Sequence, residues 1–181
     1  MKDSAIEAQK AALKLFTKGR REIGYSRSEC SCSACVKWCS IMPGYLIPSD
    51  LARLIPSGMD PYAWARENLA ASSGALVSYQ GKPFRVPTLV PQRRGRQCVN
   101  LTSEGRCAIW ENAPFGCAFF SCKDTAARAV NGPLAKHGIM AVIKAWQAKE
   151  PTLYARLWAY LAYKGIEGVG SAQGNHDYNN S

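Results

Sequence analysis

The chain has 181 residues, a formal net charge of +10 and 47% hydrophobic residues. This length suits a single domain with a packed core that needs no disulfide staples. The absence of any run of about 18 apolar residues excludes a membrane-spanning helix. Charges among residues 1–10 argue against a signal peptide. We therefore expect a cytoplasmic protein with reduced thiols, in which clustered cysteines hold metal more often than they form disulfides.

The first expected element is an amphipathic helix over residues 4–18, with apolar side chains on one side and three lysines on the others. Its basic face suits an acidic partner such as nucleic acid. The same pattern is more often simply a solvated helix surface.

The first cysteine group lies within ten residues. Its first two members are too close for one helix face and indicate a turn. Ser33 can then begin a short helix whose last two cysteines lie four residues apart on one face. The group consists of Cys30, Cys32, Cys35 and Cys39.

Two short helices are expected next. Ser49 is a suitable cap for a helix over 50–55. Asp60 followed by proline is a strong start signal for a helix over 61–71, which residues 72–74 then break.

A β-hairpin is expected where residues 75–79 and 83–90 flank a short turn. Two prolines in its second arm indicate an edge strand. A basic loop over 92–96 follows, just before the next cysteine. It suits a phosphate or an acidic partner near the cysteines, or it is a simple exposed turn. Its arginines are Arg93, Arg94 and Arg96.

The second cysteine group is more widely spaced. Residues 98–101 and 107–110 flank a polar turn and predict a second hairpin in which each arm begins with a cysteine. Ser121 starts a capping pattern that makes Cys122 the first residue of a helix. The group consists of Cys98, Cys107, Cys117 and Cys122.

The last third is predicted to be helical, with one helix beginning at Pro133 and another at Pro151. Gly165 is expected to end the second helix. We expect one domain over residues 1–167, with a cysteine core at about 28–125, and a disordered tail over 168–181. His137, on the first of these helices, is not expected to bind metal.

Clustered thiolates are soft ligands that suit zinc, iron and iron–sulfur clusters. Eight cysteines can form two four-ligand sites, or one site with four uninvolved thiols. Spacing alone does not choose among zinc, iron and a four-cysteine cluster, and disulfides or separate buried thiols are the alternatives.

The order of the cysteines resembles the bacterial YkgJ-type cysteine-cluster family of zinc- or iron-chelating domains. That family has clustered cysteines ending in a Cys-Cys pair, followed by a second half that matches residues 98–122 here. The pair is replaced by Trp38-Cys39, which removes one ligand position. Trp38 either covers the site or packs in the core. The matching segments are Cys98-Val-Asn-Leu101, Gly105-Arg-Cys107-Ala-Ile109, Pro114-Phe-Gly-Cys117 and Cys122.

The resemblance implies metal binding and no established reaction. Flagellin lysine methylases have a similar cysteine cluster, but this chain has little room for further catalytic apparatus. We identify no catalytic constellation. The predicted fold is α+β: a mostly helical single domain with small β-hairpins around a cysteine-ligated metal centre, on which both cysteine groups converge.

The predicted function is a metal-binding protein that holds zinc, iron or an iron–sulfur cluster in a structural or redox site. One alternative is an iron–sulfur accessory protein for the modification of another protein. The other is a basic nucleic-acid-binding module that uses the helix over 4–18 and the arginines of 92–96.

Overall fold

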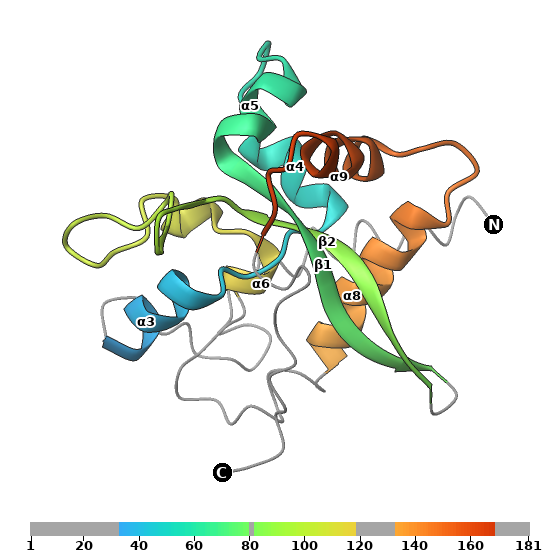
Figure 1. Cartoon of the computed structure of the whole chain (residues 1–181), viewed down its shortest axis with the longest axis horizontal. Helices are drawn as coiled ribbons and strands as arrows, with labels where there is room; N and C mark the ends of the chain where they lie inside the picture. The colour runs from blue at the N-terminus through green and yellow to red at the C-terminus, as the bar shows by residue number, and fades with distance from the viewer. Residues whose placement is uncertain (1–32, 80–81, 119–132, 169–181) are drawn as a thin grey trace.

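The computed structural model describes residues 33–79, 82–118 and 133–168. Within these ranges the chain is α+β, as predicted, with six α-helices, one 3-10 helix and two antiparallel two-stranded sheets (Figure 1). The elements are α3 (Ser33–Ile41), α4 (Pro48–Leu54), α5 (Pro61–Asn68), β1 (Leu69–Tyr79), β2 (Lys82–Pro91), β3 (Arg93–Arg94), β4 (Gln97–Cys98), η1 (Trp110–Asn112), α6 (Phe115–Ala118), α8 (Pro133–Trp146) and α9 (Leu153–Tyr163).

Several predictions concern segments outside the described residues, and the structure does not test them. They are the helix over 4–18, the capping pattern at Ser121 and the tail over 168–181, of which the structure describes only residue 168. Three of the cysteines also fall there, namely Cys30, Cys32 and Cys122.

The central element is the predicted hairpin, formed by β1 and β2 in a register that pairs Leu69 with Pro91 and Tyr79 with Lys82. Strand β1 begins earlier than predicted, because residues 69–71 were expected to end a helix and residues 72–74 to break it, whereas all six are strand. The cause is tertiary, because Leu69 is buried in the core and pairs with β2, which overrides local helix propensity. The register shifts between Ser72 and Ala75.

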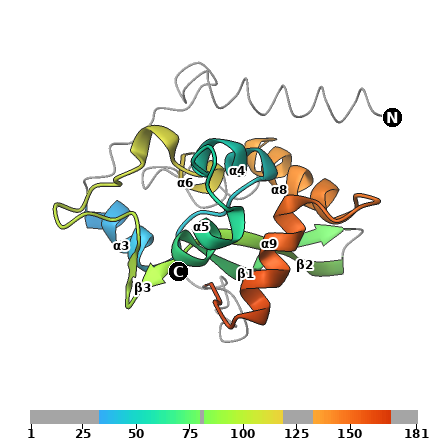
Figure 2. The same cartoon turned by 90° about the horizontal axis from the view of Figure 1, so that it is seen from above.

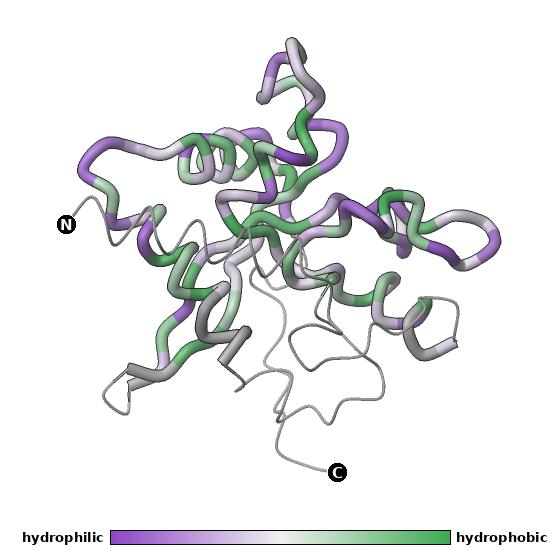
Figure 3. Tube along the Cα trace, turned by 180° about the vertical axis from the view of Figure 1, so that it is seen from behind, coloured by the Kyte–Doolittle hydropathy of each residue, from purple (hydrophilic) through white to green (hydrophobic). Residues whose placement is uncertain are grey.

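Four helices, α4, α5, α8 and α9, pack on the hairpin or on one another and bury the hydrophobic core. Figure 2 shows α6 and α8 along the same side of the hairpin, with α3 beyond one end of it. Figure 3 shows hydrophobic residues along the inner segments and hydrophilic residues on outer loops. The buried core consists of Leu46, Ile47, Leu51, Ala65, Leu69, Ala71, Val86, Leu89, Phe115, Val142, Ala145, Tyr154, Leu157 and Leu161.

Side-chain caps explain where α5 and α9 begin. Asp60 accepts a hydrogen bond from the Ala63 amide at 2.9 Å, which confirms the predicted start of α5. Thr152 caps α9 in the same way, so that α9 begins two residues after Pro151. The prediction that Ser49 caps α4 is wrong, because α4 begins at Pro48 and the Asp50 carboxylate accepts from the Ile47 amide at 2.9 Å.

The side chain of Tyr154 joins α9 to two other segments. Its buried hydroxyl donates to the Leu46 carbonyl at 2.8 Å and accepts from the Leu89 amide at 2.8 Å. Burial raises the pKa of Tyr154, which keeps the hydroxyl neutral and able to donate. The bond to Leu46 holds the segment that runs from α3 to α4, and this segment borders the site described below.

No helix in the described part of the chain is long and apolar enough to cross a membrane.

Replacement of Tyr154 by phenylalanine tests the role of this hydroxyl. Tyr154→Phe leaves two buried backbone groups without their partner, and each such group costs about 1–3 kcal/mol. We expect a loss of about 2–4 kcal/mol in the free energy of unfolding, measured by urea denaturation. The matched control is Tyr163→Phe, at a side chain that is 85% exposed. A change below about 0.5 kcal/mol in Tyr154→Phe would contradict this role.

Candidate metal centre

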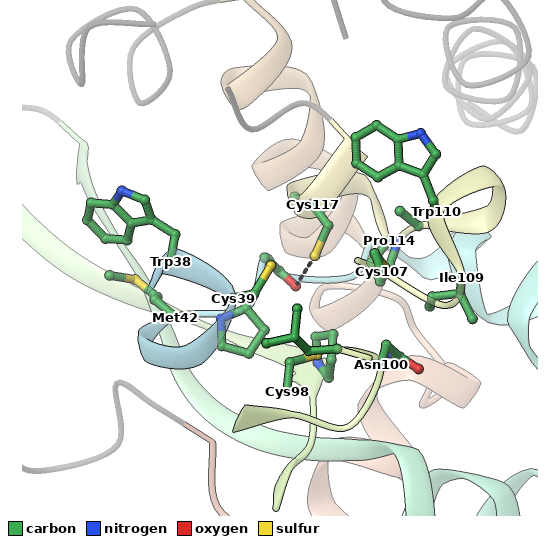
Figure 4. Close-up of a pocket in the computed structure, with 16 residues that line it drawn as sticks. Trp38, Cys39, Met42, Cys98, Asn100, Cys107, Ile109, Trp110, Pro114 and Cys117 are labelled. Atoms are coloured by element: carbon green, nitrogen blue, oxygen red, sulfur yellow. Dashed lines mark hydrogen bonds between the residues drawn. The ribbon is translucent and has the colours of Figure 1, made fainter. Parts of the chain in front are cut away.

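Four cysteines from both groups line one cavity of about 70 Å³. Cys39 comes from α3, Cys98 from β4 and Cys117 from α6, while Cys107 lies in the loop between β4 and η1. Figure 4 shows their side chains around the cavity. None of the four forms a disulfide. The remaining wall is largely apolar, with Trp38, Met42, Pro43, Pro91, Leu101, Ile109, Trp110, Ala113 and Pro114 beside Gly44, Asn100 and Gly116.

Helix α3 supplies the cysteine from the first group. It begins at Ser33 and contains Cys35 and Cys39 one turn apart, as predicted. The side chain of Cys35 lies outside the part of the chain that the structure describes. Trp38 borders the cavity and is 36% exposed. This position fits a residue that covers the site better than one that packs in the core.

The segment that follows α3 lies with its backbone directly against the start of α6. The Gly116 amide donates to the Tyr45 carbonyl at 2.8 Å, and the Cys117 thiol donates to the Gly44 carbonyl at 3.7 Å. A Cβ atom on Gly44 would lie 2.3 Å from the Cys117 amide nitrogen, and one on Gly116 would lie 2.5 Å from the Tyr45 nitrogen. Both glycines are therefore required for this approach, because any larger residue would push the two segments apart.

The buried carboxylate of Asp50 fixes the chain just before Cys117. It accepts from the Phe115 amide at 2.9 Å and pairs with Arg53 at 2.7 Å. Arg53 also donates to the carbonyls of Asn112 and Ala113, which lie in the same loop. Burial raises the pKa of Asp50, whereas its backbone hydrogen bonds and Arg53 oppose this rise. Helix α4 thus anchors the entry to α6.

The second cysteine group is held by turns more than by strands. Strands β3 and β4 form a small hairpin that places Arg93 opposite Cys98. The predicted second hairpin is wrong in extent, because only Leu101 and Cys107 form a bridge. Residues 98–101 form a turn in which the Leu101 amide donates to the Cys98 carbonyl at 3.0 Å. Two further bonds join the arms, from the Ala108 amide to the Asn100 carbonyl and from the Thr102 amide to the Arg106 carbonyl, each at 2.8 Å.

The environment of the cavity favours neutral thiols when no metal is bound. Burial raises the pKa of Cys39 to about 11, and the neighbouring Cys98 and Cys107 thiols add to the rise. Burial raises the pKa of Cys117 well above its usual value, and charge repulsion from the neighbouring cysteines adds to the rise.

Burial also raises the pKa of Cys98, but two neighbouring residues oppose this rise. Hydrogen bonds from the backbone and side chain of Asn100, and the charge of Arg93, favour the thiolate form of Cys98. A bound cation would reverse the balance at Cys39, Cys98 and Cys117, because a coordinating thiol loses its proton.

The four cysteine thiols that line the cavity are soft donors and fit a soft metal, but they are not gathered closely around one point. Among the residues that the structure describes, no group of three or more histidine, cysteine, aspartate or glutamate side chains is gathered closely enough to hold a metal ion. Zinc–sulfur bonds of about 2.3 Å would require the sulfurs to move closer together. The prediction that all eight cysteines bind metal therefore stays a prediction.

Comparisons with protein-family models, curated proteins and solved structures find no match to this chain. The resemblance to the YkgJ-type family accordingly stays a prediction as well.

Sequence reasoning missed the residues that position the cysteines. The roles of Gly44, Asn100 and Gly116 depend on contacts that the linear pattern does not reveal. Gly44 and Gly116 each lie near a proline and a cysteine in the sequence. This shared pattern is the local signal that could have identified them. Asp50 carried no such signal.

Replacement of Gly44 by alanine tests the close approach at the cavity. The new Cβ would overlap the backbone of Cys117, and such overpacking costs about 3 kcal/mol or more when the clash is with rigid backbone. We also expect a thiol reagent to label Cys117 faster, because α6 would separate from the segment over 43–45. Peptide mass spectrometry measures the rate of labelling.

The matched control is Gly58→Ala, where the added Cβ meets open space and only the positive φ of 78° opposes it. We expect a cost of about 1–2 kcal/mol and unchanged labelling of Cys117. Equal labelling in both variants would show that the glycine contact does not shape the cavity.

Proposed function

We propose that this protein binds zinc or iron, the latter as an ion or within an iron–sulfur cluster, through its two cysteine groups, and that the site is mainly structural. The observation that carries the proposal is the single cavity lined by Cys39 of the first group and by Cys98, Cys107 and Cys117 of the second.

The number and type of these donors support metal binding. Four thiolates complete a tetrahedral zinc site, and four cysteines also hold the common iron–sulfur clusters. The cavity volume of about 70 Å³ exceeds the roughly 10–15 Å³ that a single water needs, so an ion fits. An all-cysteine site leaves zinc no open position for a substrate or water, which argues against hydrolysis and for a structural role.

Loading of the site requires two changes in the protein. The thiols must lose their protons, which the cation favours, and the sulfurs must draw together around it. The elements that carry them are short, with nine residues in α3 and four in α6. Cys35 is the nearest further donor along the chain, because it lies one helical turn before Cys39. Metal binding would thereby couple these elements and add to the stability of the fold.

The other predicted functions stay predictions. An iron–sulfur accessory protein would be brown and would absorb visible light, whereas a zinc protein would be colourless. A nucleic-acid-binding module would use the segment over 4–18 together with Arg93, Arg94 and Arg96, of which Arg94 and Arg96 are exposed, and its binding would weaken steeply with salt. The cytoplasmic location also stays a prediction.

Metal analysis of protein purified without oxygen tests the proposal. We expect bound zinc or iron in the wild-type chain, measured by elemental analysis and native mass spectrometry. Cys107→Ser and Cys117→Ser should each lose most of the metal and melt at a lower temperature, because a weak oxygen donor replaces a thiolate. The matched control is Ile109→Val, which trims the apolar wall of the same cavity and should retain the metal.

Wild-type protein that carries neither zinc nor iron, and that takes up neither when they are added, would refute the proposal. Full metal retention in both cysteine variants would show that the metal lies elsewhere.

A further inference from the structure

The end of α3 presents three apolar side chains to solvent. Trp38, Ile41 and Met42 are spaced three and four residues apart, which places them on one helical face, and the Met42 amide still donates to the Trp38 carbonyl at 2.7 Å. Ile41 and Met42 are each 44% exposed. Figure 4 shows the side chains of Trp38 and Met42 side by side. These three residues form the α3 apolar face.

Such a face differs from the scattered apolar residues of an ordinary surface. Single exposed apolar side chains are common, whereas adjacent ones rimmed by polar residues mark interaction sites. The α3 apolar face is also continuous with the cavity, because Trp38 and Met42 line both. Methionine adapts its shape to apolar partners, which suits a docking surface.

Two segments that pack against α3 carry exposed cations. Strand β4 contacts α3, and the β3–β4 hairpin exposes Arg94 and Arg96. The turn over 102–106 also lies against α3, since a Cβ atom on Gly105 would be 3.0 Å from the Val36 side chain. This turn ends at the exposed Arg106. The surroundings of the α3 apolar face are therefore basic on more than one side.

The balance of charge around this face favours an acidic occupant. Residues 33–47 and 92–118 contain five lysines and arginines, including the exposed Lys37, against the two carboxylates Glu104 and Glu111, which gives a net charge of +3. A second copy would bring surfaces and whole chains of like charge together. Nucleic acid would match the charge, but the aliphatic Ile41 and Met42 offer neither a stacking ring nor a donor to phosphate.

We propose that the α3 apolar face is a docking site for an acidic, amphipathic segment of another protein. The apolar side chains of that segment cover Ile41 and Met42, in the manner of an amphipathic helix laid on an apolar surface. Its carboxylates complement the arginines of the β3–β4 hairpin and of the turn over 102–106, which sets the orientation of the segment. The inference goes beyond the proposed function, because docking requires no metal in the cavity.

The test measures binding of a short fluorescent peptide to the full chain by fluorescence anisotropy. The peptide has leucine and phenylalanine at helical spacing and glutamate at its other positions. One companion peptide has glutamine in place of glutamate, and another has the same composition in scrambled order. We expect the acidic amphipathic peptide to bind, and each companion to bind at least about tenfold more weakly at low salt.

Variants of the chain locate the peptide on α3. We expect Met42→Gln and Ile41→Asn each to weaken binding at least about fivefold, because both remove an apolar anchor. Met42→Leu keeps an apolar side chain and should keep the affinity. The matched control is Met59→Gln, at a methionine that is 48% exposed between α4 and α5, and it should change the affinity less than about twofold.

Every other outcome overturns the inference. The wild-type chain fails to bind the peptide, or Met42→Gln and Ile41→Asn bind it as well as wild type. A dimer of the wild-type chain that Met42→Gln dissociates, measured by sedimentation, assigns the face to a second copy instead. Tighter binding of a labelled oligothymidine that Met42→Gln abolishes assigns it to nucleic acid. Circular dichroism checks the fold of each variant, and if Met42→Gln does not fold, Ile41→Asn decides.

Discussion

The cysteine cavity depends on one backbone contact. The segment after α3 and the start of α6 lie against each other through Gly44 and Gly116, and the Cys117 thiol bonds to the Gly44 carbonyl across 73 residues of sequence. This contact sets Cys39 and Cys117 on the walls of the same cavity. Tyr154 and Asp50 hold the two segments from the side of the core, so the packing of the helices determines the geometry of the thiols.

The electrostatics of the cavity suit a site that changes charge on loading. Burial among apolar walls favours the neutral thiols of Cys39 and Cys117 without metal, which avoids several negative charges in a confined space. In the proposed metal-bound state, a cation would remove the protons and leave a net negative centre. Hydrogen bonds from Asn100 and the charge of Arg93 lower the pKa of Cys98 and oppose the effect of burial.

Local signals predicted the fold better than they predicted the site. The cap at Asp60, the helix from Ser33 and the hairpin were predictable because each depends on neighbouring residues. The early start of β1 at Leu69 was not, because it depends on pairing with a strand that comes later in the chain. Cysteine spacing pointed to two groups, of which Cys39, Cys98, Cys107 and Cys117 line one cavity. It could not reveal the glycine contact, since this depends on how distant segments pack.

The most direct test of the central claim is X-ray absorption spectroscopy at the edge of the metal bound to anaerobically purified protein. The account predicts a first shell made only of sulfur, with distances of about 2.3 Å and a coordination number near four for zinc. A first shell of nitrogen or oxygen atoms would contradict it, because the ligands would then not be the cysteines that line this cavity.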